Sequence, residues 1–418
     1  MKICFIADSS SIHVKRIAKY HLKQRDEVFV VSTSTVRSDI PGAKMAYLIA
    51  AAEREPGMAP ANGRSRMLQN LLRWGVPRGA RSYLRRTLRD LSVLRSRRTC
   101  AEEMAEFNPD IVFCHRAFPE GVLASWCYAK PLVIRTAGPD ISKWPKYPVY
   151  RQLIRYGLRS TSLILTESAW EKDWLRRLCG GAVRIEVSII GIDTVIFQPQ
   201  PMREKLRERY GLPKDAFVVV TNRYLTGHYN GWLVVEALES IMRDHPRLIL
   251  LYASPLKMDA DTKARAEAVM SRCSAIRIFE GPITQLEVAD ILACGDLYVS
   301  FSSYDGIPNS VLEAMACGLV PVVADLPQLH EWIDSGVDGY HVPQYDKEAL
   351  ASMVSDLYWR RGALPQMAAR CVEKIRTRAS YELCSEKTRC LMKNLATTHG
   401  PGKKTGVVSG IELDTGYE

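Results

Sequence analysis

Short apolar runs alternate along this chain of 418 residues with longer stretches of helical periodicity. The apolar run at residues 3–6 predicts a buried strand, and the polar residues 8–11 predict a turn rich in helix-capping side chains. Apolar residues then recur at helical spacing over 12–22, and 27–32 is apolar again. A strand, a turn, a helix and a strand in this order are typical of the start of a parallel α/β sheet.

The same rhythm continues and then restarts after Pro199. Further strands are predicted at 111–114, 132–134 and 163–165, and after the restart at 217–220, 248–252, 276–279, 297–301 and 320–323, with a helix at 232–242. The predicted fold class is therefore α/β, with two Rossmann-like, doubly wound domains facing across a cleft. Ligands of such sheets bind beyond the carboxyl ends of the strands, so the cleft is the predicted site.

This pattern predicts how the chain divides. We expect a first domain at 1–190, interrupted by an insertion at 62–99, and a second domain at 191–375. A last helix at 376–396 is expected to return to the first domain. Residues 397–418 mix Gly, Lys and Thr without apolar periodicity, which is typical of a disordered tail.

Composition restricts the class of protein. Hydrophobic residues make up 47% and charged residues 25%, as in water-soluble globular proteins, and no apolar run approaches the roughly 20 residues of a membrane span. Lys2 leads directly into the first strand, so we expect no signal peptide. The 11 cysteines are scattered and form no Cys-x-x-Cys pair, which argues against disulfides and zinc and predicts a cytoplasmic protein.

The charge is concentrated in the insertion. Between Arg64 and Arg98 the chain carries eleven arginines and a single acid, Asp90, so this segment holds +10 of the net +11. Leu and Trp residues alternate with these arginines at helical spacing, which favours an anionic membrane surface as partner and a peripheral location on its inner face. The alternative is a helix pair packed on the first domain with a solvated arginine face. Nucleic acid is not expected, because no recognised binding motif accompanies the charge.

The strongest chemical signal follows the strand at 297–301. Residues 302–318 read Ser-Ser-Tyr-Asp-Gly-Ile-Pro-Asn-Ser-Val-Leu-Glu-Ala-Met-Ala-Cys-Gly: a loop, a helix that Asn309 or Ser310 caps, and Gly318 to end it. Amides of the loop and of the first helical turn predict a phosphate site. Glu313 can accept two hydrogen bonds from a ribose diol, and Asp305 can hold sugar hydroxyls. The alternative is an ordinary capped helix with solvated acids.

These residues resemble glycosyltransferase family 4, whose members are retaining enzymes with the GT-B fold. Asp305 to Glu313 matches the acidic-x7-Glu motif of that family, and the resemblance continues through residues 313–323 and 331–339. Residues 190–193 resemble its linker, and residues 137–141 a variant of its first-domain loop. The resemblance implies that Glu313 binds the nucleotide ribose, that Asp305 contacts the donor sugar, and that the amides of the segment Gly306, Ile307, Pro308, Asn309 and Ser310 meet the diphosphate.

The chain departs from the family pattern at three positions. The first acid is Asp305 instead of Glu. Arg223 matches a cation that neutralises the diphosphate, but Tyr229 stands where a Lys usually follows. Ala137 replaces a His near the reacting face of the sugar, and His115 is a candidate substitute. The alternative is that His115 is a structural histidine, as a lone His more often is. We expect no metal, because no His, Asp or Glu cluster at ligand spacing is visible and cationic side chains with helix amides can manage the leaving group.

Residues of the acceptor or cleft side are predicted at Ser11, His13 and Arg16, on the first turns of the first helix, together with His115 and Asp140. For the helix residues the alternative is a set of surface side chains on an amphipathic helix.

The function predicted from these observations is retaining transfer of a sugar from a nucleoside diphosphate sugar, with a UDP-sugar favoured as co-substrate and no other cofactor. The expected acceptor is a saccharide or a lipid-linked saccharide in surface polysaccharide, lipopolysaccharide or glycolipid biosynthesis. Two alternatives are a nucleotide-sugar epimerase on the same fold and a degenerate subunit that binds the sugar nucleotide without turnover.

Overall fold

The structure is a computed structural model, which describes residues 1–49, 78–127, 131–142, 144–181, 183–254, 258–280 and 284–398. Its backbone contacts divide the chain into two compact units. Unit 1 consists of Met1–Arg135, Leu153–Ile164 and Thr388–Glu418, and unit 2 of Thr136–Gln152 and Leu165–Lys387. The domain boundaries expected from the sequence stay predictions.

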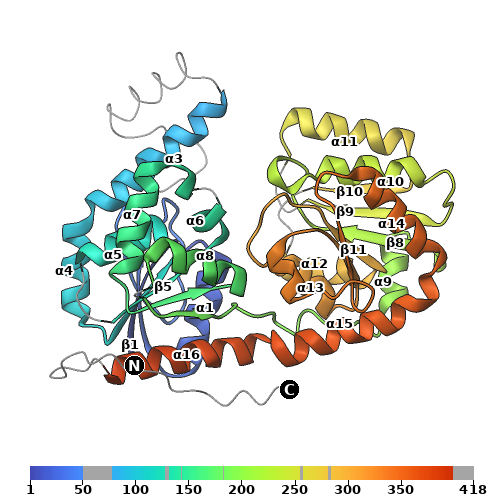
Figure 1. Cartoon of the computed structure of the whole chain (residues 1–418). Coiled ribbons are helices and arrows are strands. Elements are labelled where there is room, and N and C mark those ends of the chain that lie inside the picture. The colour runs from blue at the N-terminus through green and yellow to red at the C-terminus, as the bar shows by residue number, and fades with distance from the viewer. Residues whose placement is uncertain are drawn as a thin grey trace. The chain divides into compact units, whose positions relative to one another are not determined.

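The first sheet has seven strands in the order β3-β2-β1-β4-β5-β6-β7 (Figure 1). The strands are β1 (Lys2–Ala7), β2 (Glu27–Ser32), β3 (Lys44–Tyr47), β4 (Ile111–His115), β5 (Leu132–Arg135), β6 (Leu163–Thr166) and β7 (Ile185–Val187). The pairs of β1 with β2 and with β4 are parallel, with Cys4 opposite Phe29 on one side and Val112 on the other. The order reverses between β1 and β4, which is the switch point of a Rossmann sheet.

The second sheet repeats this topology with six strands in the order β10-β9-β8-β11-β12-β13. Its strands are β8 (Phe217–Thr221), β9 (Leu248–Ala253), β10 (Ile276–Phe279), β11 (Leu297–Ser300), β12 (Val320–Ala324) and β13 (Tyr340–Val342). The pairs of β8 with β9 and with β11 are parallel. The switch point here lies between β8 and β11. Both predicted doubly wound sheets are thus confirmed.

Helices connect the strands and cover the sheets (Figure 1). They are α1 (Ile12–Lys23), α3 (Arg78–Arg95), α4 (Arg97–Phe107), α5 (Val122–Cys127), α6 (Gly138–Ser142), α7 (Pro148–Arg159), α8 (Ala169–Cys179), α9 (Arg203–Arg209), α10 (Gly231–Ile241), α11 (Ala260–Arg272), α12 (Gln285–Ala293), α13 (Asn309–Ala316), α14 (Lys347–Trp359), α15 (Leu364–Arg378) and α16 (Tyr381–Thr398). Short helical turns include η3 (Gly227–Tyr229) and η4 (Pro327–Glu331).

The second sheet is buried on both faces, because alternate residues of its strands belong to different cores. Val218 and Val220 pack into a core with residues of α12, α13 and α15. Phe217 and Val219 pack into another core with residues of α10, α11 and α14. A strand whose side chains point alternately to two apolar layers reads as a continuous apolar run, and this explains why these strands are visible in the sequence.

The structure adds strands that the sequence pattern missed. These are β3, β7 and β13, each three or four residues long. Within the predicted insertion, α3 and the start of α4 are described, whereas residues 50–77 lie outside the described part. Helix α16 extends to Thr398, two residues into the predicted tail, and residues 399–418 are likewise not described.

A buried carboxylate joins the last helix to the rest of unit 1. Asp26 accepts hydrogen bonds from His21 Nδ1 at 2.9 Å and from Arg389 Nε at 2.9 Å. Burial acts to raise the pKa of Asp26, but these hydrogen bonds outweigh it and hold the pKa well below its ordinary value. On α16, Thr388 also accepts from Arg135 Nη2 at 3.4 Å. Two segments far apart in the sequence are therefore parts of one folded unit.

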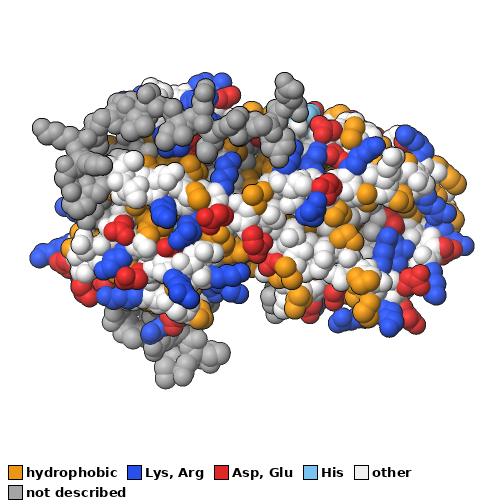
Figure 2. All heavy atoms as spheres, turned by 90° about the horizontal axis from the view of Figure 1, so that it is seen from below, with side chains coloured by type: hydrophobic (Ala, Val, Ile, Leu, Met, Phe, Trp, Pro, Cys, Tyr) orange, Lys and Arg blue, Asp and Glu red, His pale blue; other side chains and the backbone are white. Residues whose placement is uncertain are grey.

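The described surface shows no large area of a single charge on the face drawn in Figure 2, where Lys and Arg side chains are interspersed with Asp and Glu. Among the helices that the structure describes, none is both long enough and apolar enough to cross a membrane.

Candidate functional site

The residues of the predicted donor site follow the two strands at the switch point of the second sheet. Arg223 comes two residues after β8, and Asp305 follows β11 by a short loop. Because β8 and β11 are parallel neighbours, their carboxyl ends lie at the same edge of the sheet. The fold therefore brings together two groups that are 82 residues apart in the sequence.

Arg223 is held by three side chains. Its Nη1 donates to the Ser310 hydroxyl at 2.8 Å, its Nη2 lies 3.4 Å from the Ser302 hydroxyl, and it forms an ion pair with Asp305. Burial acts to lower the pKa of Arg223, but the neighbouring Asp305 carboxylate raises it above its ordinary value. The guanidinium group is thus a permanent, fixed cation at the start of α13.

The Asp305 loop is held by one hydrogen bond within the loop and one from the Gln328 side chain. The Gly306 amide donates to Asp305 Oδ1 at 3.0 Å, and the buried Gln328 of η4 donates to the Asp305 carbonyl at 2.7 Å. The Ile307 side chain is 3% exposed and belongs to the core, so only the backbone of this residue can serve a ligand.

The two ends of helix α13 are capped in different ways. The prediction that Asn309 or Ser310 caps it is wrong: the N-cap is Pro308, which makes no side-chain bond, and both polar residues are helical. The Ser310 hydroxyl contacts Arg223 instead. At the other end Gly318 has a φ of 82°, and its amide donates to the Met315 carbonyl at 3.0 Å, as predicted for a glycine that ends a helix.

Glu313 lies on the same face of α13 as Ser310, because residues three apart on a helix are neighbours. Its side chain is half-buried. The first amides of a helix, here those of Asn309 and Ser310, have no intrahelical acceptor. The described geometry therefore arranges helix amides, a guanidinium group and a carboxylate along one short helix.

Tyr229, at the position where family members usually carry a Lys, packs on Arg223. The centre of its ring lies 4.5 Å from the guanidinium carbon, which is a cation–π contact. Burial raises the pKa of Tyr229 to about 12, so its hydroxyl stays neutral. Next to it, the rings of His228 and Tyr304 stack at 4.2 Å. Tyr229 thus fixes the single cation but does not replace the charge of the absent Lys.

Two acids that the sequence analysis missed also belong to unit 2 and lie beside the Asp305 loop. The Ile307 amide donates to Glu167 Oε2 at 3.3 Å. The neighbouring Glu171 is buried, and this burial together with the charges of Asp305 and Glu331 raises its pKa. These residues directly follow β6, so a search for acids after each strand end would have found them.

The predicted Asp140 is also part of unit 2 and is 1% exposed. Its Oδ2 accepts from the Ala137 amide at 3.1 Å, so this carboxylate shapes the turn that contains the predicted variant loop. A Cβ added to Gly138 would lie 3.2 Å from the Gly306 nitrogen. The loop at Ala137 therefore approaches the donor loop through a residue that has no side chain.

The other predicted acceptor residues lie in unit 1. Ser11 is the N-cap of α1 and makes no side-chain cap bond, and His13 and Arg16 are on the first turns. His115 is the last residue of β4 and is 6% exposed. The His13 and His115 rings are 6.1 Å apart, so the structure brings these two predicted residues together.

One possible metal-ligating group did not show in the sequence spacing. Among the described residues, Asp325, His330 and His341 offer ligand atoms that all lie within 4.8 Å of one another. His330 Nε2 is bonded to Asp325 at 2.6 Å, and Asp325 and His330 are exposed. The expectation of a metal-free reaction therefore stays a prediction.

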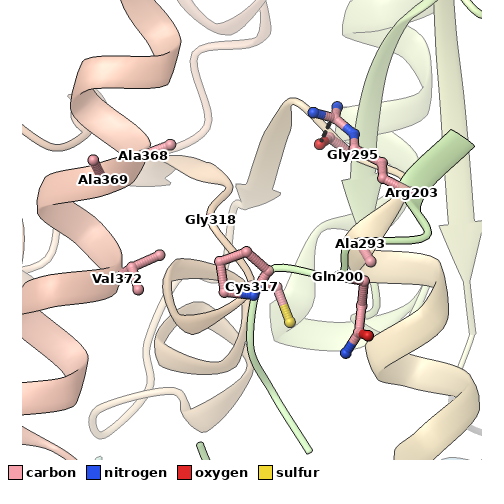
Figure 3. Close-up of a pocket in the computed structure, with 10 residues that line it drawn as sticks. Gln200, Arg203, Ala293, Gly295, Cys317, Gly318, Ala368, Ala369 and Val372 are labelled. Carbon is pink, nitrogen blue, oxygen red and sulfur yellow. Dashed lines mark hydrogen bonds between the residues drawn. The ribbon is translucent and has the colours of Figure 1, made fainter.

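A cavity of about 190 Å³ lies in unit 2, away from the residues described above (Figure 3). Cys317 and Gly318 line it, so it lies at the carboxyl end of α13, whereas Arg223 and Ser310 lie at the amino end. Figure 3 shows Arg203 at its wall, where this side chain donates to the Gly295 carbonyl at 2.8 Å. The cavity therefore lies away from the predicted donor site.

Two family models match the chain and together cover most of it. Residues 10–195 match the model described as Glycosyltransferase Family 4, and residues 218–359 match the model described as Glycosyl transferases group 1. The second match contains Arg223, Asp305 and Glu313, and the first contains His13 and His115.

Relatives with known names agree with these models. TuaC from Bacillus subtilis, named as a teichuronic acid biosynthesis glycosyltransferase, is 28% identical over 220 residues, which is 51% of this chain and about half, 52%, of that protein. A GDP-mannose-dependent phosphatidylinositol monomannoside mannosyltransferase from Mycolicibacterium smegmatis is 28% identical over 60% of this chain and 67% of its own. D-inositol 3-phosphate glycosyltransferase 1 from Catenulispora acidiphila is 26% identical over 46% and 48%.

A solved structure shows the same fold. HepE from Anabaena, in complex with UDP-glucose, superposes with a TM-score of 0.68 at 16% sequence identity, and the match covers 94% of this chain and 100% of that one. The two doubly wound sheets are thus those of a GT-B fold. With both halves of the sequence matched by glycosyltransferase family models and with named relatives in polysaccharide and glycolipid biosynthesis, the chain is a glycosyltransferase similar to those of family 4.

Proposed function

We propose that the protein transfers a sugar, with retention of the anomeric configuration, from a nucleoside diphosphate sugar to a saccharide acceptor. The observation that carries this proposal is Arg223, a permanent cation fixed by Ser310 and Asp305 at the amino end of α13. A diphosphate at this point would meet the helix amides and the guanidinium group together. Glu313, on the same helix face, is suited to accept hydrogen bonds from the ribose.

The roles follow from where charge develops. When the glycosidic bond to the donor breaks, negative charge grows on the departing diphosphate, and a fixed cation in place before the reaction stabilises it. Asp305 keeps Arg223 in position and can hold a donor-sugar hydroxyl with its other oxygen. No other chemistry is needed to stabilise the leaving group, so the nucleotide sugar is proposed as the sole co-substrate.

The choice of donor and acceptor rests on the relatives. HepE was solved with UDP-glucose, and this supports a UDP-sugar as the donor. The names of the relatives from Mycolicibacterium smegmatis and Catenulispora acidiphila include molecules with a phosphate group, and TuaC is named for teichuronic acid. We therefore favour a lipid-linked saccharide or a glycolipid as the acceptor, at the inner membrane surface, with the Arg64 to Arg98 segment as the membrane contact.

The central test is the substitution Glu313→Gln. It removes the carboxylate charge and keeps the size of the side chain, so it should weaken donor binding by about 1.5–3 kcal/mol, the range for hydrogen bonds to a charged group. Calorimetry with UDP and UDP-sugars measures this, after mass spectrometry has identified which nucleotide sugar of a mixture stays bound to the wild type.

Glu267→Gln is the matched control, since Glu267 is an exposed acid on α11 of the same unit. Equal donor affinity in Glu313→Gln and wild type would rule out the ribose role. Donor turnover without any acceptor would favour the epimerase, and binding without turnover over a panel of acceptors would favour a degenerate subunit.

A further inference from the structure

Unit 1 has a group of cationic and histidine side chains at the switch point of its own sheet, between β1 and β4. We infer that His13, Arg16, His115 and Arg116, here named the His–Arg cluster, form a subsite for an oxyanion, the phosphate or carboxylate group of the acceptor. This inference rests on the proposed function, because it assigns the acceptor of that transfer to a chemical class.

The topology brings the cluster together. His13 and Arg16 lie on the first turns of α1, which directly follows β1, whereas His115 ends β4 and Arg116 follows it. Ile6 pairs with Cys114 in the parallel register, so both strands end at the same edge. The two imidazole rings lie 6.1 Å apart and are inclined by 49°, an arrangement that leaves them neither stacked nor bonded to each other.

Both histidines contain a buried nitrogen without a partner. Among the described residues, Nδ1 of His13 and Nδ1 of His115 have no hydrogen-bond partner. His115 is only 6% exposed. Buried polar atoms are nearly always paired with protein, water or ligand, because leaving one unpaired is costly. A ligand that accepts a hydrogen bond from each ring would satisfy both atoms.

The surroundings of the two rings are positively charged. Burial, followed by the charges of Arg16, Arg135 and Arg116, lowers the pKa of His13 to about 4. Burial, His13, Arg116 and Arg135 likewise lower the pKa of His115 well below its ordinary value. Neutral imidazoles can each donate one hydrogen bond, while the guanidinium groups supply charge for an anion.

The nearby acids Glu120 and Asp8 have partners of their own. Glu120 Oε1 accepts from Thr33 at 2.7 Å, and burial raises the pKa of this carboxyl to about 7 although Arg116 opposes the shift. Asp8 accepts from the Ser10 hydroxyl and from Arg89 at 3.3 Å. The charges that lower the pKa of the two rings are thus those of arginines and not of these acids.

Helix α1 adds to this charge. It is 12 residues long, its N-cap Ser11 makes no side-chain cap bond, and its first turn contains no acid. The positive end of the helix dipole is therefore directed at the same edge, with no acid in the first turn of the helix itself. Arg116 has a φ of 102°, which is rare for a residue with a side chain and is typical of functional positions.

The experiment measures binding of simple anions to the full chain in the absence of donor. Wild type is titrated by calorimetry with inorganic phosphate, with succinate, and with phosphatidylinositol-containing vesicles compared with phosphatidylcholine vesicles. The phosphate and succinate arms distinguish the two anion types, and the vesicle arm distinguishes a lipid headgroup from a free anion. We expect saturable binding in at least one arm, weakened about tenfold in Arg116→Gln by loss of one charge-assisted contact.

Further variants distinguish this subsite from the donor site and from a general effect of positive charge. Arg159→Gln, at the carboxyl end of α7 and exposed, is the matched control and should bind as wild type. Arg223→Ala removes the cation of the donor site, and anion binding should persist in it. If Arg116→Gln fails to fold, Arg16→Gln is measured in its place.

Histidine proton NMR gives a second readout. Anion binding should raise the pKa of His13 and His115, and their signals are assigned by their loss in His13→Gln and His115→Gln. Absence of saturable binding in every arm, or equal affinity of Arg116→Gln and wild type, overturns the inference. Nucleotide binding is measured on the same samples. If the wild type binds no nucleotide, the proposed function is overturned. If it binds nucleotide but no anion, only the subsite is overturned.

Discussion

A single arginine carries the cationic charge at the amino end of α13. Ser302, Ser310 and Asp305 hold the Arg223 guanidinium group, and the Tyr229 ring covers it. A side chain that is fixed before the substrate binds needs no reorganisation during the reaction, which is the condition for strong electrostatic stabilisation of a transition state. Tyr229 thus holds the guanidinium group in place at the position where the sequence resemblance implied a second cation.

Arg223→Ala should therefore lower kcat by about a hundredfold, with a smaller change in donor affinity, because the diphosphate charge grows in the transition state. Steady-state kinetics with the identified donor measure kcat and KM separately. Arg203→Ala is the control, since Arg203 also pairs with a carboxylate, Asp296, and Arg207 keeps that carboxylate paired after the change. A loss confined to KM would show that Arg223 acts on the ground state.

The raised pKa of Glu120 predicts that the free energy of unfolding depends on pH. Burial raises its pKa from 4.5 to about 7, so between these values the folded state holds a proton that the unfolded state has lost. The contribution of Glu120 to stability is then complete below pH 4.5 and is lost as the pH rises through about 7. Glu120→Gln removes this dependence, and its stability relative to wild type should improve by up to about 3 kcal/mol across the window.

Urea unfolding at several pH values, followed by fluorescence, measures this difference. Glu27→Gln, at an exposed acid of the same unit, should track wild type throughout. A constant difference between Glu120→Gln and wild type from pH 4 to pH 8 would mean that Glu120 ionises normally in the folded protein.

At this scale the sequence predicted the residues with a motif and missed those without one. Asp305, Glu313 and Arg223 have a recognisable spacing, and the structure pairs Arg223 with Asp305. The contact of Tyr229 with Arg223 depends on a side-chain orientation that no sequence pattern encodes. The contact of Glu167 with the Ile307 amide spans 140 residues, so no local spacing predicts it.

At the scale of elements, burial decides which strands a sequence reveals. β8 and β12 are buried along their whole length and show as apolar runs, whereas β3 has no buried residue among its four and includes an exposed lysine. An edge strand of this kind is fixed by its pairing with β2, which is a tertiary contact. Local hydrophobicity therefore identified the central strands and, of the edge strands, only β10.

In helix α3 and at the start of α4, the structure shows which arginines are exposed and can be tested for membrane binding. Arg89 does not point to solvent, because it contacts Asp8 and the Thr33 carbonyl. Arg95 and Arg97 are exposed. If the segment binds anionic headgroups, Arg95→Gln with Arg97→Gln should weaken binding by about 2 kcal/mol at low salt, at roughly 1 kcal/mol for each basic residue.

Co-sedimentation with phosphatidylglycerol vesicles at low and high salt measures this effect. The double variant Arg176→Gln with Arg177→Gln removes equal charge from the exposed end of α8 and should bind as wild type. Equal sedimentation of all three proteins at low salt would assign the exposed arginines to a solvated face.

At the scale of the whole molecule, the two sheets share one strand order, and in each the candidate residues follow the strands that flank the switch point. The fold class could be predicted because this order follows from alternating strands and helices. How the chain divides into compact units depends on contacts of long sequence separation, which group Thr136–Gln152 and Leu165–Lys387 into the second unit, and a local pattern does not encode such contacts.

The transfer reaction as a whole should survive exhaustive treatment with EDTA, because a fixed guanidinium group and helix amides are placed to stabilise the leaving diphosphate. Product formation before and after chelation measures this, with and without added magnesium. If activity falls and magnesium or zinc restores it, the variant His341→Ala tests whether the group of Asp325, His330 and His341 is responsible.

The pairing of Asp26 with Arg389 has a consequence for biosynthesis. The carboxylate leaves the ribosome well before its arginine partner, which lies 363 positions later in the chain. Unit 2 ends at Lys387, so its chain is complete before α16 has been fully synthesised. Unit 2 can therefore fold while the surface of unit 1 that α16 contacts is still exposed. Unit 1, whose synthesis starts earlier, would consequently depend more on chaperones than unit 2.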